Sequence, residues 1–309
     1  MDVLLVVAGL AILLLAGDLL VKGAVNLSLR VGIPALIVSL TVVAFGTSAP
    51  ELLIAVEAIL ADAPGIALGN VVGSNTANVL LVLGLPALLA GLATSGHDAR
   101  GSYWQMMAAT ALFVAVCFVG PIVWWHGLVL LGGLAVMLAM AFVKARDHRK
   151  NGEEDLEGVD PSAPGWRIAA SLVLGLIGLP LGADLLVDGA TGIAKEFGMS
   201  DEDIGLTLVA VGTSLPELAT TVMAAYRRQA DVALGNVLGS NMFNLLAIIG
   251  IAALVGPIPV APGFLTFDLW VMVGASVLLA PFVFGRDITR FWGALLTALY
   301  VGYVVLVLI

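Results

Sequence analysis

Long apolar stretches alternate along the chain with short breaks that contain glycine, proline or charged residues. A helix needs about 20 apolar residues to cross the hydrocarbon core of a bilayer. Five stretches long enough to span lie on each side of one long polar segment, and they predict an all-α membrane protein with ten spans. The predicted spans are 3–26, 33–60, 67–93, 103–120, 122–143, 167–192, 203–226, 232–255, 265–284 and 289–309.

Composition places the chain in lipid rather than in water. Hydrophobic residues make up 61% of its 309 residues, charged residues 11%, and the mean hydropathy is +1.10. So little polar surface cannot coat a water-soluble globule. The formal charge of -9 comes mostly from loop residues and predicts no nucleic-acid partner. Cys117 has no second cysteine to pair with, and the sequence predicts neither a cofactor nor an obligatory protein partner.

The basic residues predict an orientation. Lys and Arg favour the cytoplasmic side of short loops. If the polar segment 144–166 is a cytoplasmic linker, both termini face outward, and of the 13 basic residues only Lys195 lies outside. The N-terminal sequence lacks a basic segment and a clear cleavage site, so it is interpreted as a retained first span rather than a signal peptide.

The two halves of the chain repeat each other. TVVAFGTSAPELL, from Thr41, matches TLVAVGTSLPELA, from Thr207, and GNVVGSNTANVLLVLG, from Gly69, matches GNVLGSNMFNLLAIIG, from Gly235. The offset is 166 residues in both cases, a register that shared hydrophobicity does not produce. Because each half has an odd number of spans, the second enters the membrane from the opposite side. We therefore predict two inverted repeats, 1–143 and 167–309, with a binding site near the midplane where they meet.

Proline interrupts the first motif of each half. Pro50 has no N–H and clashes with the carbonyl four residues earlier, which frees the Gly46 carbonyl, and Pro216 does the same to Gly212. Non-helical backbone at membrane depth is tolerated only where it is buried in protein or lines a polar cavity. A bound ion would satisfy the freed carbonyl.

The same motif contains an acidic residue that is costly in a membrane. Thr47 and Ser48 lie four and three residues before Glu51, so that hydroxyls and carboxylate share one helical face. An ionised side chain at the bilayer centre costs about 2.5 to 3.5 kcal/mol on insertion scales. The neighbouring spans offer no basic residue to compensate. The second half repeats the arrangement with Thr213, Ser214 and Glu217.

Oxygen atoms also line the helix that carries the second motif. Asn70, Ser74 and Asn78 advance by four residues and share one stripe. Oxygen ligands without histidine or thiol suit Ca²⁺, Na⁺ or Mg²⁺ rather than Zn²⁺ or copper. Two carboxylates balance one Ca²⁺ or two Na⁺, and a site that one load or the other must neutralise predicts exchange. The equivalent stripe in the second half is Asn236, Ser240 and Asn244.

These paired motifs closely resemble the two alpha repeats of the cation/calcium exchanger superfamily, in particular the prokaryotic sodium/calcium exchangers. The resemblance covers nearly the whole chain. It implies a multi-pass protein of a prokaryotic inner or plasma membrane that exchanges Na⁺ for Ca²⁺ by alternating access. It also implies cation ligands at Ala44, Thr47, Ser48, Glu51, Ser74, Asn78, Ala210, Thr213, Ser214, Glu217, Ser240 and Asn244, those of Ala44 and Ala210 being backbone carbonyls.

The chain departs from this pattern at one position. Several relatives carry Asp where this chain has Asn244, and potassium-dependent members use Asp in this region, so the resemblance implies no potassium co-transport. In such exchangers the first and sixth spans slide across a fixed core. Here those spans carry Asp18 and Asp184, whose role the sequence leaves open.

Three alternatives remain at this stage. A proton/calcium antiporter is the nearest, because a buried glutamate can take up a proton near neutral pH. A channel suits two nearly symmetric repeats with midplane carboxylates less well than alternating access does. An intramembrane enzyme would need a base beside a serine, and His97, His126 and His148 lie in loops or at span ends, away from both motifs. We therefore predict a transporter and not an enzyme.

Overall fold

The computed structural model describes residues 1–96, 98–151, 164–196 and 212–308. Within these ranges all regular structure is helical, apart from two isolated antiparallel bridges, Leu92 with Ile288 and Ile122 with Ile258. The predicted all-α class is therefore confirmed. The predicted ligand Ala210 lies outside the described residues.

The first half runs from α1 to α8 and includes two short π-helical segments, η1 and η2. Its helices are α1 (Asp2–Val31), α2 (Ala35–Val38), η1 (Ser39–Val43), α3 (Ala44–Thr47), α4 (Ala49–Leu60), α5 (Pro64–Ala77), η2 (Asn78–Val82), α6 (Gly84–Ala90), α7 (Arg100–Val119) and α8 (Trp124–Asn151).

The second half begins at α9 and contains two further π-helical segments, η4 and η5. Its described helices are α9 (Gly165–Glu196), α12 (Leu215–Tyr226), α13 (Ala230–Met242), η4 (Phe243–Ile248), α14 (Ile249–Val255), η5 (Phe264–Asp268), α15 (Leu269–Leu278), α16 (Ala280–Val283) and α17 (Arg290–Leu308).

The described helices are long and apolar enough to cross a membrane many times. Eight of them pass this test, and a ninth span results if the bent pair Ala35–Thr47 and Ala49–Leu60 is counted as one. Every predicted span except 203–226 is helical over most of its length, and α12 represents that one within the described residues. The chain is therefore a multi-pass membrane protein.

Helix ends differ from the predicted span ends. Helix α8 continues to Asn151 although its span was predicted to end at 143, so part of the predicted linker is helical. The reason is that an apolar window marks the part of a helix that lies in lipid. A helix whose backbone bonds are already satisfied can continue beyond it into the polar region.

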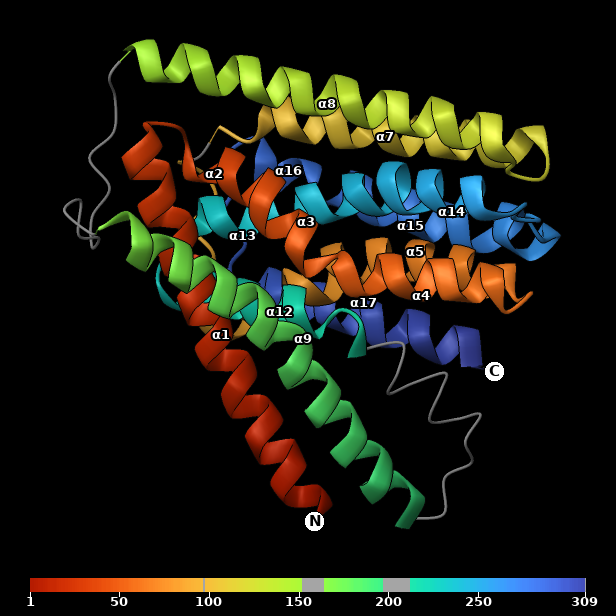
Figure 1. Ribbon diagram of the computed structural model, residues 1–309, viewed down its shortest axis with the longest axis horizontal. Coiled ribbons are helices and arrows are strands. Elements are labelled where there is room, and N and C mark those ends of the chain that lie inside the picture. The colour runs from red at the N-terminus through yellow and green to blue at the C-terminus, as the bar shows by residue number, and fades with distance from the viewer. Residues whose placement is uncertain (97, 152–163, 197–211, 309) are drawn as a thin grey trace.

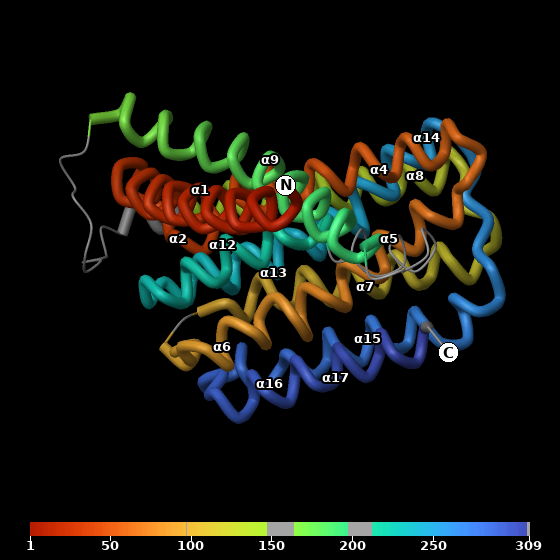
Figure 2. The backbone as a smooth tube through the Cα atoms, turned by 90° about the horizontal axis from the view of Figure 1, so that it is seen from below, coloured from red at the N-terminus to blue at the C-terminus, as the bar shows by residue number. Residues whose placement is uncertain are grey.

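Two kinds of helix position are visible in Figures 1 and 2. Most helices lie side by side along one direction, whereas α1 and α9 cross them obliquely as an adjacent pair. The segment Ala230–Val255 lies at the centre, and 89% of its most apolar window is buried inside the protein. The segment Arg290–Val307 lies at the periphery, and only 11% of its window is buried. This central segment carries the motif GNVLGSN of the second half, so the motif faces protein rather than lipid.

Glycine allows α1 and α9 to pack backbone against backbone. A Cβ added to Gly9 would lie 2.5 Å from the Leu186 nitrogen, and one added to Gly175 would lie 3.0 Å from the Ala16 carbonyl oxygen. Small residues permit this close approach between membrane helices. The pair is therefore a tightly joined unit that lies against the remaining helices.

Contacts between the halves occur in matched pairs. If each residue of the Leu92–Ile288 bridge is replaced by its equivalent 166 residues away in the other half, the result is the Ile258–Ile122 bridge. The close approach of Gly9 to Gly182 becomes that of Gly175 to Ala16 in the same way. Exchanging the two halves thus preserves these contacts.

Candidate functional site

Two broken helices form the centre of the candidate site. Helix α3 ends and α4 begins at Ser48, whose backbone angles are φ -85° and ψ 6°, and the two segments bend by 42°. Ser214, before α12, has φ -90° and ψ 3°. Pro50 and Pro216 occupy the first turns that follow, where a missing N–H costs nothing. The predicted proline breaks therefore fall in the equivalent places of the two halves.

Each break places a carboxylate in the first turn of a helix. Glu51 lies in the first turn of α4 and Glu217 in the first turn of α12. The unpaired N–H groups and the positive dipole end of a helix stabilise negative charge at this position. Sequence reasoning missed this compensation, although proline followed by an acidic residue is the signal for it.

Both carboxylates are fully buried and lack a countercharge. Glu51 is 1% exposed and Glu217 is 0% exposed. The two side chains are close enough to interact electrostatically, and neither forms an ion pair within the described ranges. Removing an ion from water costs several kcal/mol unless its partners compensate. The pair therefore requires neutralisation from outside the chain.

Hydroxyl and amide groups join the two halves around this pair. The Ser48 hydroxyl donates to Glu217 Oε1 at 3.2 Å. The Thr47 hydroxyl donates to Asn236 Oδ1 at 3.3 Å, and in the equivalent contact the Thr213 hydroxyl donates to Asn70 Oδ1 at 3.4 Å. Residues separated by more than 140 positions thus meet at one place.

Several buried oxygens near these motifs have no hydrogen-bond partner in the described structure. They are Glu51 Oε2, Glu217 Oε2, Asn75 Oδ1, Asn78 Oδ1, Ser240 Oγ and Asn244 Oδ1. Buried polar atoms are normally paired with protein, water or an ion. The predicted ligands Glu51, Glu217, Asn78, Ser240 and Asn244 are all in this group.

The remaining predicted ligands are also buried where the structure describes them. Ser74 is 4% exposed, and the Ala44 carbonyl accepts a hydrogen bond from the Ser48 backbone N–H at 3.0 Å. The hydroxyls of Ser240 and Thr47 lie beside the Glu217 carboxylate. The structure thus brings Thr47, Ser48, Glu217 and Ser240 together across the two halves.

The second motif ends in an irregular helix in both halves. Asn78 begins η2, and Asn244 lies in η4. π-Helical segments are rare and occur frequently at functional sites. Asn78 also donates from Nδ2 to Asn241 Oδ1 at 3.0 Å, which links the two motifs directly. Sequence reasoning missed both the π-helical segments and the contribution of Asn241.

A multi-pass helical membrane protein in which two broken helices bring buried carboxylates together has the architecture of an ion-coupled secondary transporter. A family model described as "Sodium/calcium exchanger protein" matches residues 1–143 and 167–309. The chain belongs to the sodium/calcium exchanger family. It is therefore a transporter and not an enzyme, and its family membership assigns to it the exchange of calcium against another cation.

Individual relatives cover almost the whole chain. "Sodium/calcium exchanger MaX1" of Methanosarcina acetivorans is 32% identical over 98% of this chain and 97% of that protein. A solved structure of the sodium-calcium exchanger NCX_Mj, soaked with Na⁺ and Sr²⁺, matches with a TM-score of 0.82 and 32% identity, covering 98% of this chain and 97% of that one. "Ca(2+)/H(+) antiporter ChaA" of Bacillus subtilis is 27% identical over 82% of this chain and 78% of that protein.

Proposed function

We propose that the chain is a secondary active antiporter that exchanges Na⁺ for Ca²⁺ by alternating access. One observation carries the proposal: Glu51 and Glu217 are buried, interact with each other, and each keeps an oxygen without a partner. Two buried negative charges are stable only when cations neutralise them. A protein that must be loaded to be stable moves between its two states carrying one kind of cation or the other.

The other proposed ligands surround these carboxylates with oxygen. Ca²⁺ takes six to eight oxygen ligands in flexible geometry, from carboxylates, carbonyls and amides. The partnerless oxygens of Asn78, Ser240 and Asn244 suit this requirement. The full proposed set is Ala44, Thr47, Ser48, Glu51, Ser74, Asn78, Ala210, Thr213, Ser214, Glu217, Ser240 and Asn244.

Sodium is proposed as the driving ion because the relatives named for it match this chain more fully than the proton-coupled one. The match with this chain spans 97% of MaX1 and 97% of NCX_Mj, whereas it spans 78% of ChaA at lower identity. The second candidate, a proton/calcium antiporter, is favoured by the ChaA match and by the ability of a buried carboxylate to take up a proton.

The proposed architecture consists of two inverted repeats, 1–143 and 167–309, joined by a cytoplasmic linker at 144–166. The offset of 166 residues and the matched bridges between the halves support it. We further propose a prokaryotic plasma membrane as the location, with both termini outside. Single cysteines introduced into a Cys117→Ala background test this orientation with a maleimide that cannot cross the membrane. Ser95→Cys should react only when the maleimide is inside the cell, and Ala61→Cys only when it is outside.

Radioactive calcium uptake into reconstituted vesicles tests the function. With pH clamped on both sides, an outward sodium gradient should drive calcium uptake, and dissipating the gradient should stop it. Calcium uptake that does not depend on the sodium gradient but is driven by an imposed pH gradient would overturn sodium coupling in favour of the proton-coupled candidate. Normal exchange by Glu51→Gln or Glu217→Gln would overturn the site itself.

A further inference from the structure

Asn236 differs from Asn70, Asn78 and Asn244 in having both its amide oxygen and its amide nitrogen engaged in hydrogen bonds within the described structure. Its side chain is 0% exposed, and its Oδ1 accepts from the Thr47 hydroxyl at 3.3 Å. Its Nδ2 donates to the Glu217 carbonyl oxygen at 3.3 Å and to the Thr221 hydroxyl at 3.2 Å. Asn236 Oδ1 is therefore already engaged as an acceptor, in contrast to Asn78 Oδ1 and Asn244 Oδ1, which have no partner in the described structure.

The bond to Thr47 matters because of how a hydroxyl binds a cation. A hydroxyl has one hydrogen and two acceptor lone pairs. A cation attracts the lone pairs and repels the hydrogen, so the hydrogen must point elsewhere. The Ala44 carbonyl, 3.3 Å away, and the Glu217 carboxylate are the other acceptors near the Thr47 hydroxyl. Asn236 offers a third acceptor, which leaves that carbonyl and that carboxylate to other partners.

The same arrangement occurs in the other half, where Thr213 donates to Asn70 Oδ1 at 3.4 Å. We propose that Asn236 and Asn70 are positioning residues of the exchange site that orient the Thr47 and Thr213 hydroxyls with their lone pairs toward the cation. This inference rests on the proposed function, since it concerns ligands of the same site. It assigns the two asparagines a different role from Asn78 and Asn244, although all four lie on the same sequence stripe.

A double-mutant cycle tests this role. Asn236→Leu should raise the KM for calcium roughly tenfold, the effect of losing one well-placed hydrogen bond. In a Thr47→Val background the same change should have little further effect, because the hydroxyl it orients is gone. Asn236→Asp, which keeps the acceptor, should restore part of the affinity for calcium. Asn70→Leu with Thr213→Val repeats the cycle in the other half if Asn236→Leu does not fold.

Additive effects of the two changes, or a lower maximal rate with an unchanged KM, would overturn the positioning role. These outcomes are separate from a failure of the proposed function, which Glu217→Gln reports. If Glu217→Gln is inactive while the effects in the cycle are additive, the proposed exchange site is retained and the positioning role of Asn236 is rejected.

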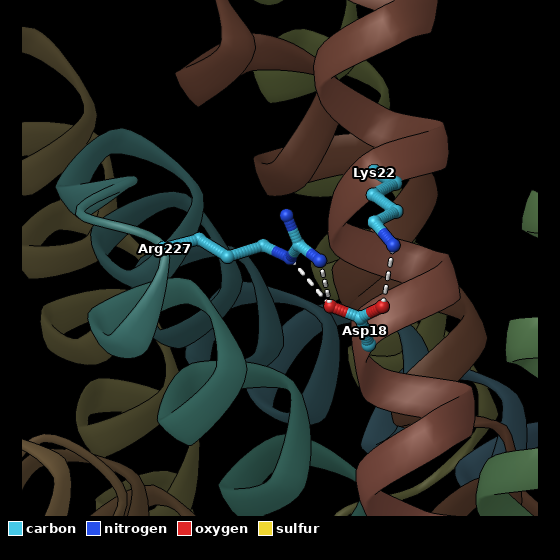
Figure 3. A network of polar contacts seen from close by, with 3 residues as sticks. All are labelled: Asp18, Lys22 and Arg227. Atoms are coloured by element: carbon cyan, nitrogen blue, oxygen red, sulfur yellow. Dashed lines mark hydrogen bonds and ion pairs between the residues drawn. The ribbon is translucent and has the colours of Figure 1, made fainter. Parts of the chain in front are cut away.

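A second, independent observation concerns the face on which α1 meets α12. Figure 3 shows Asp18 of α1 between Lys22 on its own helix and Arg227 at the end of α12. Lys22 Nζ lies 2.8 Å from Asp18 Oδ2, and Arg227 is bound to Asp18 Oδ1 through both Nε and Nη2. Beside this cluster a Cβ added to Gly17 would lie 3.0 Å from the Ala219 carbonyl oxygen. Close packing and charge thus join α1 to α12.

Exchange of the halves does not reproduce this cluster. The equivalents of Asp18, Lys22 and Arg227 are Asp184, Asp188 and Ala61, which contain two negative charges and no positive one. Packing differs as well: Ala219 is 7% exposed, whereas its equivalent on α4, Leu53, is 64% exposed. The α1–α9 pair therefore packs against α12, whereas within the described residues the equivalent position on α4, at Leu53, stays exposed.

In an inverted-repeat transporter the two access states are related by exchanging the contacts of the two halves. The opposite state would place α9 against α4 and separate α1 from α12. We infer that Asp18, Lys22 and Arg227 form a one-sided ionic latch, which favours the state closed at the C-terminal end of α12. The inference rests on alternating access, as proposed above. Because α4 and α9 carry no equivalent latch, the two states differ in energy.

Labelling measures the latch without transport. In a Cys117→Ala, Met223→Cys background, Asp18→Asn should increase the rate of labelling by an impermeant maleimide several-fold, because α1 leaves α12 more often. Asp98→Asn removes the exposed ion pair with Lys144, at 3.7 Å, and should leave the rate unchanged. Ala61→Arg, which supplies Asp184 with a partner on the other side, should shift the equilibrium the same way as Asp18→Asn.

Transport measurements then show which membrane face the latch closes. In vesicles of defined orientation, Asp18→Asn should raise the calcium KM at the face opposite the latch and lower it at the latch face. Unchanged labelling in Asp18→Asn, or a KM shift in the same direction at both faces, would overturn the latch. A variant that labels as expected but exchanges nothing would instead count against the proposed function.

Discussion

The two broken helices are alike in backbone and unlike in their polar surroundings. Ser48 and Ser214 adopt nearly the same angles, each followed by proline and glutamate. The Glu217 carboxylate nevertheless accepts a hydrogen bond from the Ser48 hydroxyl. Asn236 Nδ2 donates to the Glu217 backbone carbonyl and to the Thr221 hydroxyl. On the first-half side, Asn70 Nδ2 is buried and has no partner among the described residues, and the equivalent of Thr221 is Ala55.

This comparison distinguishes the features that both halves of a duplicated site retain from the hydrogen bonds that only one half has. The break and the carboxylate occur in both halves, as the proposed binding of one cation by both carboxylates requires. Within the described residues, Glu217 receives side-chain hydrogen bonds from the other residues of the site that Glu51 lacks, so the second-half carboxylate is held more firmly than the first. A firmly held ligand and a less constrained one suit a site that has to accept its cation from one side and release it to the other.

Neutralising the carboxylates is expected to have the largest effect and tests the similarity. Glu51→Gln and Glu217→Gln should each reduce calcium exchange on the order of a hundredfold, because one of the two charges that balance Ca²⁺ is lost. Radioactive calcium flux in vesicles measures this, with Asp98→Asn as an exposed acidic control. A severe loss in one variant and none in the other would mean that the two breaks are not functional equivalents.

Crowding the helix pair is expected to have the next largest effect. Gly9→Ala places a Cβ 2.5 Å from the Leu186 backbone nitrogen, where no flexible side chain can yield. Overpacking of this kind costs about 1 to 3 kcal/mol. Thermal unfolding in detergent should show a lower Tm for Gly9→Ala than for Gly132→Ala, since a Cβ on Gly132 meets no described atom within 4 Å. Equal Tm values would show that the α1–α9 contact is looser than the structure has it.

Much of this protein is predictable from its sequence, because membrane spans and repeats leave strong local signals. The apolar windows locate the described helices, although α8 continues to Asn151 beyond its window. The repeat identifies Glu51 and Glu217 as a matched pair. Pro50 and Pro216 mark the breaks, since the steric rule that governs proline acts within a single turn.

What the sequence could not supply depends on distant contacts. Asn70, Asn78, Asn236 and Asn244 share one stripe pattern. Only the fold shows that both amide atoms of Asn236 are hydrogen-bonded, whereas those of Asn244 have no partner in the part of the chain that the structure describes. The ion pair of Asp18 with Arg227 joins residues 209 positions apart, which no periodicity indicates. The π-helical segments at Asn78 and Asn244 also require packing information beyond helix propensity.

The smallest expected effect concerns the bond that one half has and the other lacks. Thr221→Val removes the acceptor of Asn236 Nδ2 while the bond from that nitrogen to the Glu217 carbonyl remains. One neutral hydrogen bond contributes about 0.5 to 1.5 kcal/mol, so a few-fold rise in the calcium KM is expected. Thr297→Val is the matched control, because the Thr297 hydroxyl donates to the Gly293 carbonyl of its own helix, the peripheral α17. If both variants change KM equally, the firmer hold on Glu217 has no bearing on calcium binding, and the asymmetry belongs to packing alone.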